Sequence, residues 1–327
     1  MTDADRNLLI ETAERAHAAR QRIREFVDET PLQRSAAFSE RVGANVYFKL
    51  ENRQVTGSFK LRGASNRLLT LTPEQRAKGC VAASSGNHGA AVACAMQALD
   101  ADGVIFVPEQ TSAAKVAKIK SYGGSVEFFG TDGLDTEQHA REHAQTHGMF
   151  YLSPYNDEQV IAGQGSCGVE LLEQLPEIDA AFIAVGGGGL IGGVGAVLKA
   201  HNADIRIYGC QPQASDVMAQ SIAAGTILDL PSEPTLSDGT AGGIEADAVT
   251  FPLNQAVVDD FVTVDEAEIA AAMRDYMAAE GDTIEGAAGV AVAALLKEAE
   301  RVAGKNVIVI ICGGNISEET LDQVRAA

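Results

Sequence analysis

The sequence predicts an α/β protein whose sheets are mostly parallel and carry helices on both faces. Short apolar, β-branched runs alternate with longer amphipathic runs along all 327 residues. Glycine-rich segments follow several of the predicted strands. Alternation of strands and helices over a whole chain is typical of parallel sheets covered on both faces by helices. The length fits two domains or one large one.

Nine segments have the length and composition of strands. Each is a short run rich in valine, isoleucine, phenylalanine or alanine, and most are bounded by glycine or polar residues. The predicted strands cover residues 46–50, 80–83, 103–107, 125–129, 150–152, 180–185, 205–210, 260–264 and 306–311.

The segments between these strands show helical periodicity, with apolar residues three and four positions apart. We expect helices over residues 112–121, 134–147, 158–174, 265–279 and 286–302, and an amphipathic N-terminal helix within residues 1–26. No tandem repeat, low-complexity tract or proline-rich linker marks a domain boundary.

Charge and cysteine content exclude several classes of protein. The formal net charge of −20 repels nucleic acid and anionic lipid, so neither is an expected partner. No apolar run approaches the ~18 residues of a membrane span, and residues 1–26 lack the apolar run of a signal peptide. The five cysteines are odd in number, far apart and without a CxxC pair, which indicates reduced thiols and a cytoplasmic location.

Four glycine-rich loops, at residues 84–89, 186–189, 238–243 and 312–315, are the main candidates for a binding site. In open α/β sheets ligands bind outside the carboxyl ends of the strands. Residues 186–189 are four consecutive glycines between an apolar strand and a helix, so their backbone N–H groups and the helix N-terminus suit a phosphate. Neither a Walker motif nor a dinucleotide fingerprint is present, which favours a small monophosphate. Each loop taken alone fits a tight turn equally well.

Lys60 is a candidate nucleophile. It lies at the start of a predicted helix, which Ser58 or Thr56 caps, and Phe59 beside it indicates partial burial. A buried lysine has a lowered pKa and forms Schiff bases with carbonyl compounds. The alternative is an exposed lysine beside Arg62, and this segment alone favours that alternative.

An amine nucleophile together with a monophosphate site implies an aldehyde cofactor that carries a phosphate, which is pyridoxal 5′-phosphate. The chain resembles the fold-type II pyridoxal-phosphate enzymes, in particular the serine/threonine dehydratase and serine racemase family. The resemblance runs from Thr30 to Asn315 through six ordered motifs: KLENRQVTGSFKLRGA, SSGNHGAAVA, IAGQGS, GGGGLIGG, LSDG and CGGN. The segment 238–245 is similar to the phenylserine and hydroxyectoine-utilisation dehydratases.

The resemblance implies a role for each matched residue. Lys60 corresponds to the lysine that carries the cofactor and acts as base on one face of the substrate, and Ser85 lies on the opposite face. The cofactor is expected to contact Phe59, Lys60, Asn87, Gly186, Gly187, Gly188, Gly189, Leu190, Gly239, Glu285 and Cys312, and the substrate carboxylate to contact Ser84, Ser85, Gly86, Asn87 and His88.

Cys312 stands where the family usually has a serine beside the pyridine nitrogen. A neutral group at this place makes the cofactor a weaker electron sink, which favours β-elimination over transamination. The expected reaction is therefore dehydration of threonine, serine, phenylserine or a hydroxylated diaminobutyrate to a 2-oxo acid and ammonia. The alternatives are racemisation by Lys60 and Ser85 as two bases, dehydration of 3-hydroxyaspartate, and a non-catalytic cofactor carrier.

The resemblance also implies two domains, a homodimer and a fold of two open, mostly parallel twisted sheets. Residues 51–152 form the expected small domain with the substrate loop, and residues 1–50 and 153–327 form the large one. No metal is expected, because Gln211 and Val217 replace the acids that bind a divalent cation in related enzymes. We interpret the histidines at 139, 143 and 147, four residues apart, as a solvated helix face rather than a metal site.

Overall fold

The computed structural model describes residues 2–326 and contains two separate sheets. The larger sheet has six strands in the order β1-β2-β10-β7-β8-β9. Only β1 is antiparallel to its neighbour; the other pairs are parallel. The strands are β1 (Leu32–Arg34), β2 (Asn45–Leu50), β7 (Ala180–Ala184), β8 (Arg206–Pro212), β9 (Asp260–Val264) and β10 (Asn306–Ile311).

The smaller sheet has four strands in the order β5-β4-β3-β6, and every pair is parallel. These strands are β3 (Cys80–Ala83), β4 (Gly103–Val107), β5 (Val126–Phe128) and β6 (Phe150–Tyr151). The predicted α/β class with two mostly parallel sheets is confirmed. Strand β1 was not predicted, because three residues at an antiparallel edge are too few to show a period.

Fourteen helices are present within residues 2–326. They are α1 (Asp3–Ile23), α2 (Ala36–Val42), α3 (Lys60–Thr70), α4 (Pro73–Ala77), α5 (Asn87–Ala98), α6 (Ala113–Ser121), α7 (Gly133–His147), α8 (Glu158–Gln174), α9 (Gly189–His201), α10 (Val217–Ala224), α11 (Thr250–Val257), α12 (Glu266–Glu280), α13 (Gly286–Lys297) and α14 (Glu318–Ala326). The predicted helix over 286–302 is wrong at its end, since α13 stops at Lys297 and a 3₁₀ turn covers Ala299–Val302. No helix of these residues is long and apolar enough to cross a membrane.

The central strands of both sheets are buried on both faces, whereas the edge strand β5 is largely exposed. In the small sheet, Val81 and Phe106 pack against α7, whereas their neighbours Ala82 and Ile105 pack toward α3 and α5. This alternation follows from the period of two in a strand. In the large sheet α13 packs on β7, β8, β9 and β10, and α9 packs on β7. The continuous apolar runs of β7 and β10 therefore have partners on each side.

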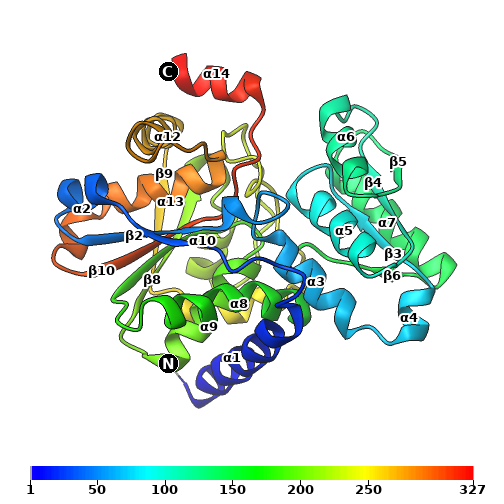
Figure 1. Ribbon diagram of the computed structural model, residues 1–327, viewed down its shortest axis with the longest axis horizontal. Coiled ribbons are helices and arrows are strands. Elements are labelled where there is room, and N and C mark those ends of the chain that lie inside the picture. The colour runs from blue at the N-terminus through cyan, green and yellow to red at the C-terminus, as the bar shows by residue number, and fades with distance from the viewer. Residues whose placement is uncertain (1, 327) are drawn as a thin grey trace.

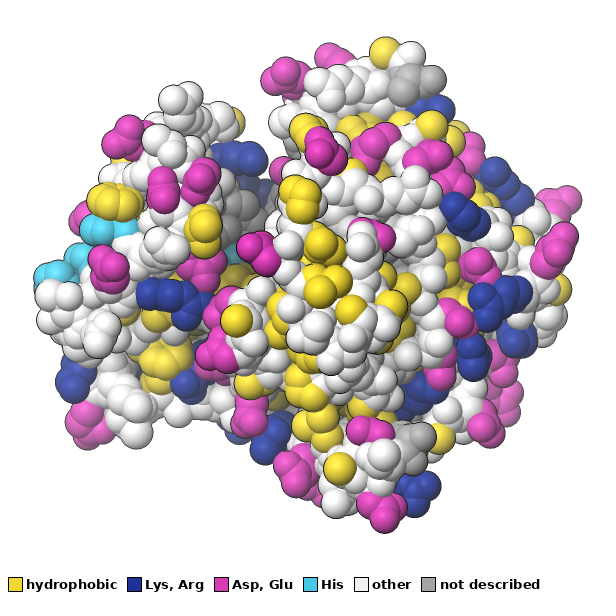
Figure 2. Space-filling model, turned by 180° about the vertical axis from the view of Figure 1, so that it is seen from behind, with side chains coloured by type: hydrophobic (Ala, Val, Ile, Leu, Met, Phe, Trp, Pro, Cys, Tyr) yellow, Lys and Arg dark blue, Asp and Glu magenta, His cyan; other side chains and the backbone are white. Residues whose placement is uncertain are grey.

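The two sheets lie side by side, and α3 lies between them (Figure 1). Helix α3 packs against α5 beside the small sheet and against α8 beside the large one. In the space-filling view the surface is hollowed between the two parts, and acidic and basic side chains are interspersed over this face (Figure 2). The first residue of α3, Lys60, is thus placed where the two parts meet.

Candidate active site

A cavity of about 1160 Å³ lies between the two sheets. It is lined by the loops that follow β3, β6, β7 and β10, which is where an α/β sheet places ligands. The cavity brings together every residue that the sequence assigned to cofactor or substrate: Phe59, Lys60, Ser84, Ser85, Gly86, Asn87, His88, Gly186, Gly187, Gly188, Gly189, Leu190, Gly239, Glu285 and Cys312.

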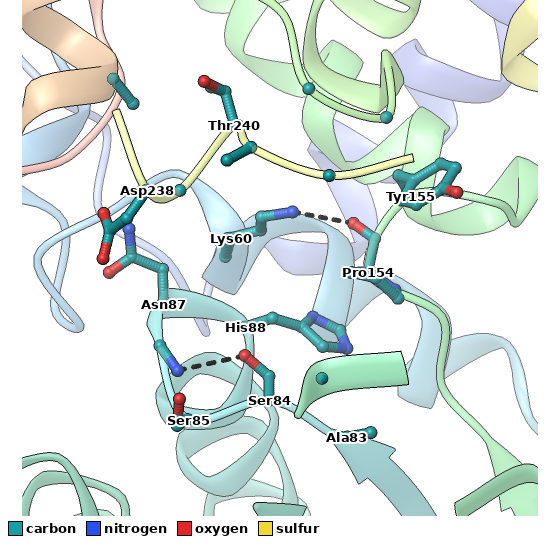
Figure 3. Close-up of a pocket in the computed structure, with 18 of the residues that line it drawn as sticks. Lys60, Ala83, Ser84, Ser85, Asn87, His88, Pro154, Tyr155, Asp238 and Thr240 are labelled. Atoms are coloured by element: carbon teal, nitrogen blue, oxygen red, sulfur yellow. Dashed lines mark hydrogen bonds between the residues drawn. The ribbon is translucent and has the colours of Figure 1, made fainter. Parts of the chain in front are cut away.

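Lys60 reaches this cavity from the first turn of α3. The preceding loop is fixed to the segment after β10, because Phe59 N donates to Cys312 O (3.1 Å) and Gly314 N donates to Gly57 O (3.0 Å). The Nζ of Lys60 donates to Pro154 O at 3.0 Å (Figure 3). Burial lowers the pKa of Lys60 to about 8, and the carboxylate of Glu285 opposes this shift. At pH 7 roughly a tenth of the Lys60 amine is therefore unprotonated, against well under a thousandth for an ordinary lysine.

Two sequence interpretations around Lys60 are wrong. The N-cap residue of α3 is Phe59, without a side-chain cap, so neither Ser58 nor Thr56 caps the helix. The alternative of an exposed lysine beside Arg62 also fails, since Lys60 is half-buried and Arg62 is fully buried and pairs with carboxylates in other elements. Such buried guanidinium–carboxylate pairs hold the first turn of α3 in place, because breaking one leaves an unpaired buried charge.

The loop after β3 presents the N-terminus of α5 to the cavity. Its Gly86 N donates to Ser84 Oγ at 3.1 Å, which shapes the turn before Asn87 begins the helix (Figure 3). Free N–H groups at a helix N-terminus bind carboxylates well. His88 donates from Nε2 to Leu152 O at 2.9 Å, and burial lowers its pKa to about 3. His88 is therefore a neutral, fixed group.

The glycine loop 186–189 forms a cradle at the N-terminus of α9. Gly188 has a φ of +84°, which favours glycine, and α9 begins at Gly189 without a side-chain cap. A Cβ at Gly187 would lie 2.4 Å from the Tyr155 ring, and one at Gly188 would lie 1.8 Å from Asn254 Nδ2. Side chains are therefore excluded from this loop, and its backbone N–H groups are not covered. Together with the N-terminus of α9 they suit a phosphate.

Glu285 and Cys312 lie together on the large-sheet side of the cavity. Burial raises the pKa of Glu285 to about 7, although hydrogen bonds from Asn87 oppose the shift. The Sγ of Cys312 lies 3.9 Å from Glu285 Oε1, and burial raises the pKa of this thiol well above its usual value. Cys312 therefore stays a neutral thiol, as the sequence prediction requires for a group beside a pyridine nitrogen.

The residues present fit pyridoxal phosphate. An amine of lowered pKa, a glycine cradle at a helix N-terminus and a neutral thiol share one cavity with an amide donor, Asn87. These groups match an aldehyde, a phosphate, a pyridine nitrogen and a ring oxygen in turn. The cavity volume is also ample for this cofactor together with an amino acid.

Several cavity residues were missed by the sequence analysis. Tyr155 packs on the glycine loop, and Arg141 forms ion pairs with Glu137 (2.7 Å) and Glu245 (2.8 Å). Asn315 donates to Asn87 Oδ1 at 2.6 Å. Asn315 belongs to the CGGN motif and could have been singled out there. Tyr155 and Arg141 lie in no sequence motif that would have indicated a place in the cavity.

The histidines of α7 form the expected solvated face only in part. His139 stacks on Phe129 with ring centroids 3.6 Å apart, and both His139 and His143 contact the edge of Phe106. Of the three histidines, His147 is exposed, whereas His139 and His143 are half-buried. Within residues 2–326 no group of three or more histidine, cysteine or acidic side chains is arranged to hold a metal.

Comparison with known proteins gives consistent matches. Residues 23–313 match the family described as pyridoxal-phosphate dependent enzyme. The chain is 37% identical to an L-threonine ammonia-lyase of Thermotoga maritima over 313 residues, covering 96% of this chain and 78% of that protein. It is 36% identical to an L-threo-3-hydroxyaspartate ammonia-lyase of Saccharomyces cerevisiae over 298 residues, with 91% of each chain covered.

Solved structures agree with these matches. Threonine deaminase isoform 2 from Solanum lycopersicum superposes with a TM-score of 0.93 at 33% identity, covering 97% of this chain and 92% of that one. Maize serine racemase superposes with a TM-score of 0.89 at 35% identity, with 96% of each chain covered.

Proposed function

The chain belongs to the family of pyridoxal-phosphate dependent enzymes, and we propose that it is an ammonia-lyase that removes water and then ammonia from a β-hydroxy amino acid. Its relatives include proteins named threonine ammonia-lyase and 3-hydroxyaspartate ammonia-lyase. The observation that carries the proposal is the placement of Lys60. Its amine, with a pKa of about 8, lies in one cavity with the glycine cradle and the N-terminus of α5.

The groups that hold the cofactor follow from the fit of the cavity. We assign the phosphate to the backbone of residues 186–189 and the N-terminus of α9, the pyridine nitrogen to Cys312, the ring oxygen to Asn87 and the aldehyde carbon to Lys60. When bound, this cofactor supplies an electron-withdrawing ring that stabilises negative charge at the Cα of the substrate.

The chain's own groups then act on the substrate. The N-terminus of α5 binds the substrate carboxylate together with the hydroxyls of Ser84 and Ser85. Lys60 Nζ takes the Cα proton, for which its lowered pKa is suited. Cys312, as a neutral thiol, does not hold a proton on the ring nitrogen as a carboxylate would, so departure of the β-hydroxyl is favoured over slower reactions at Cα.

Racemisation is the second candidate, because one observation favours it. Ser85 lines the cavity on the loop after β3, whereas Lys60 enters from α3, so two groups from separate elements flank the same space. A base on each face of Cα is what inversion requires. The maize serine racemase is a near structural relative, with a TM-score of 0.89.

We further propose that residues 51–152 form a small domain that carries the substrate loop, that the enzyme is a homodimer, and that it works in the cytoplasm. The last point is supported by the five unpaired cysteines. The homodimer rests on the family resemblance, and light scattering of the purified protein measures it directly.

The function is tested with purified protein and a panel of L-threonine, L-serine, D-serine and L-threo-3-hydroxyaspartate. We expect a yellow protein that borohydride labels at Lys60, and release of equal amounts of 2-oxo acid and ammonia from at least one L-substrate. Lys60→Ala should lose the colour, the label and the turnover. Turnover by Lys60→Ala, or D/L interconversion without ammonia release, contradicts the proposed reaction.

A further inference from the structure

A continuous chain of hydrogen bonds crosses the cavity from α6 to α13. Lys118 Nζ donates to Asn315 Oδ1. Asn315 Nδ2 donates to Asn87 Oδ1 at 2.6 Å and to Thr56 O at 2.9 Å. Asn87 Nδ2 in turn donates to both carboxylate oxygens of Glu285, at 3.0 and 2.9 Å. Two side-chain amides therefore lie in series between an ammonium group and a carboxylate.

The ends of this chain determine which way each amide points. An ammonium group can only donate, so Asn315 must present its oxygen to Lys118. A backbone carbonyl can only accept, so Asn315 must present its nitrogen to Thr56 O. With its nitrogen on that side, Asn315 also donates to Asn87, so the atom of Asn87 that accepts this bond must be Oδ1. Asn87 then has its N–H groups on the side of Glu285 and the cavity, and the two carboxylate oxygens of Glu285 favour the same orientation from the other end.

Two glycines make room for this arrangement. A Cβ at Gly57 would lie 2.5 Å from Asn315 Oδ1, and a Cβ at Gly313 would lie 2.5 Å from Glu285 Oε1. Gly57 precedes the Lys60 helix and Gly313 belongs to the same loop as Asn315, and Gly314 N bonds to Gly57 O. The backbone that presents Lys60 is therefore also the backbone that accommodates the Asn315 amide.

We propose that Asn315 is a positioning residue that keeps the donor end of the Asn87 amide turned toward the cofactor. This inference rests on the proposed function, since it assigns Asn87 to the cofactor's ring oxygen. A ring oxygen that carries negative charge needs a donor. If the Asn87 amide were reversed, its carbonyl oxygen would face that charge. Asn315 itself does not contact the reacting atoms; it acts through Asn87.

The decisive variant is Asn315→Asp, which keeps the shape of the side chain but has no donor. Its carboxylate can pair with Lys118, but it faces the acceptor atoms Thr56 O and Asn87 Oδ1. Reversing the Asn87 amide relieves the repulsion from the introduced carboxylate but gives up the two bonds to Glu285. Because burial raises the pKa of Glu285 to about 7, its protonated carboxyl can donate to the reversed Oδ1, and the reversed amide becomes accessible. We expect the dissociation constant of pyridoxal phosphate to rise roughly ten- to a hundredfold, as for loss of a hydrogen bond to a charged group. The visible absorption of the bound cofactor should shift as well.

Lys118→Met serves as the matched control. It removes the ammonium end of the chain, but Thr56 O still holds the Asn315 nitrogen in place. The cofactor dissociation constant should therefore change by less than about threefold. Lys115→Met on the same face of α6 removes only a 3.8 Å contact to Asp238 and should leave both readouts unchanged.

A double variant tests the route of the effect. In an Asn87→Ala background, Asn315→Asp should have no further effect on cofactor affinity or absorption, because there is no amide left to reverse. Additive losses, or wild-type affinity in Asn315→Asp, would overturn the proposal. If Asn315→Asp does not fold, Asn315→Ala takes its place, because it introduces no buried charge. The loss of cofactor affinity caused by Asn315→Ala must then likewise disappear in the Asn87→Ala background. A wild-type protein that takes up no pyridoxal phosphate at all would instead refute the proposed function.

Discussion

Replacing Gly188 with alanine should weaken the binding of pyridoxal phosphate while leaving the fold intact. Gly188 has a φ of +84°, and a Cβ there would lie 1.8 Å from Asn254 Nδ2 and 3.0 Å from Met218 Cε. Asn254 is fully buried on α11, so it cannot swing away into solvent. The glycine loop must therefore move, and its backbone N–H groups move with it.

The magnitude has two parts. The left-handed backbone costs an alanine about 1–2 kcal/mol, which lowers stability whether or not cofactor is present. A displaced loop that loses one N–H bond to a phosphate loses about 1.5–3 kcal/mol of binding free energy. Because 1.4 kcal/mol corresponds to a factor of ten, the dissociation constant of the cofactor should rise roughly ten- to a hundredfold.

Gly225→Ala is the matched control for backbone strain. Gly225 has a φ of +72°, caps the end of α10 and has nothing within 4 Å of an ideal Cβ. It should lose a similar amount of stability to strain but keep wild-type cofactor affinity. Fluorescence titration of the apoproteins gives the affinity and thermal denaturation gives the stability. Unchanged affinity in Gly188→Ala would refute the assignment of the phosphate to this loop.

Four further predictions concern protons, metal and stereochemistry. Covalent trapping of pyridoxal phosphate on the apoprotein should rise between about pH 7 and 9 and level off above about pH 9, because burial lowers the pKa of Lys60 to about 8. A rise centred near the ordinary lysine value of 10.5 would contradict this. The unfolded chain binds more protons at Lys60 between pH 8 and the ordinary value of 10.5, so this group's contribution to apoprotein stability should increase over that window. A chelator should leave activity and thermal stability unchanged, since Gln211 and Val217 replace the cation-binding acids, and a loss that Mg²⁺ restores would count against it. Ser85→Ala should reduce racemisation and D-substrate elimination by ~10²–10⁴-fold but L-substrate elimination much less, as chiral analysis of the products can measure; equal losses would mean that Ser85 only positions substrate.

Much of the fold could be predicted from local patterns. The strands β3, β4, β9 and β10 begin and end where the apolar runs do, and α8 spans the predicted residues. Their apolar period is set by the faces they bury, and this information is local. Strand β1 and the end of α13 were not found, because β1 is too short to show a period and the charged segment after Lys297 still carries apolar residues at helical spacing.

The sequence by itself determined the chemical groups of the site, which are the lysine, the four-glycine loop and the SSGNH and CGGN segments. Each of these is a single residue or a continuous segment, so its chemistry can be predicted without knowing the fold. Only the tertiary structure decided how these parts act on one another. Lys60 is lowered in pKa by burial at a point where Pro154 and the loop after β10 meet α3, and the direction of the Asn87 amide depends on Asn315, Thr56 and Glu285. The histidines of α7 illustrate the same limit, since their spacing predicted a solvated face and Phe106, from another element, covers part of it. A side chain's partners and its desolvation come from whichever elements meet at that point, and spacing along one element does not encode them.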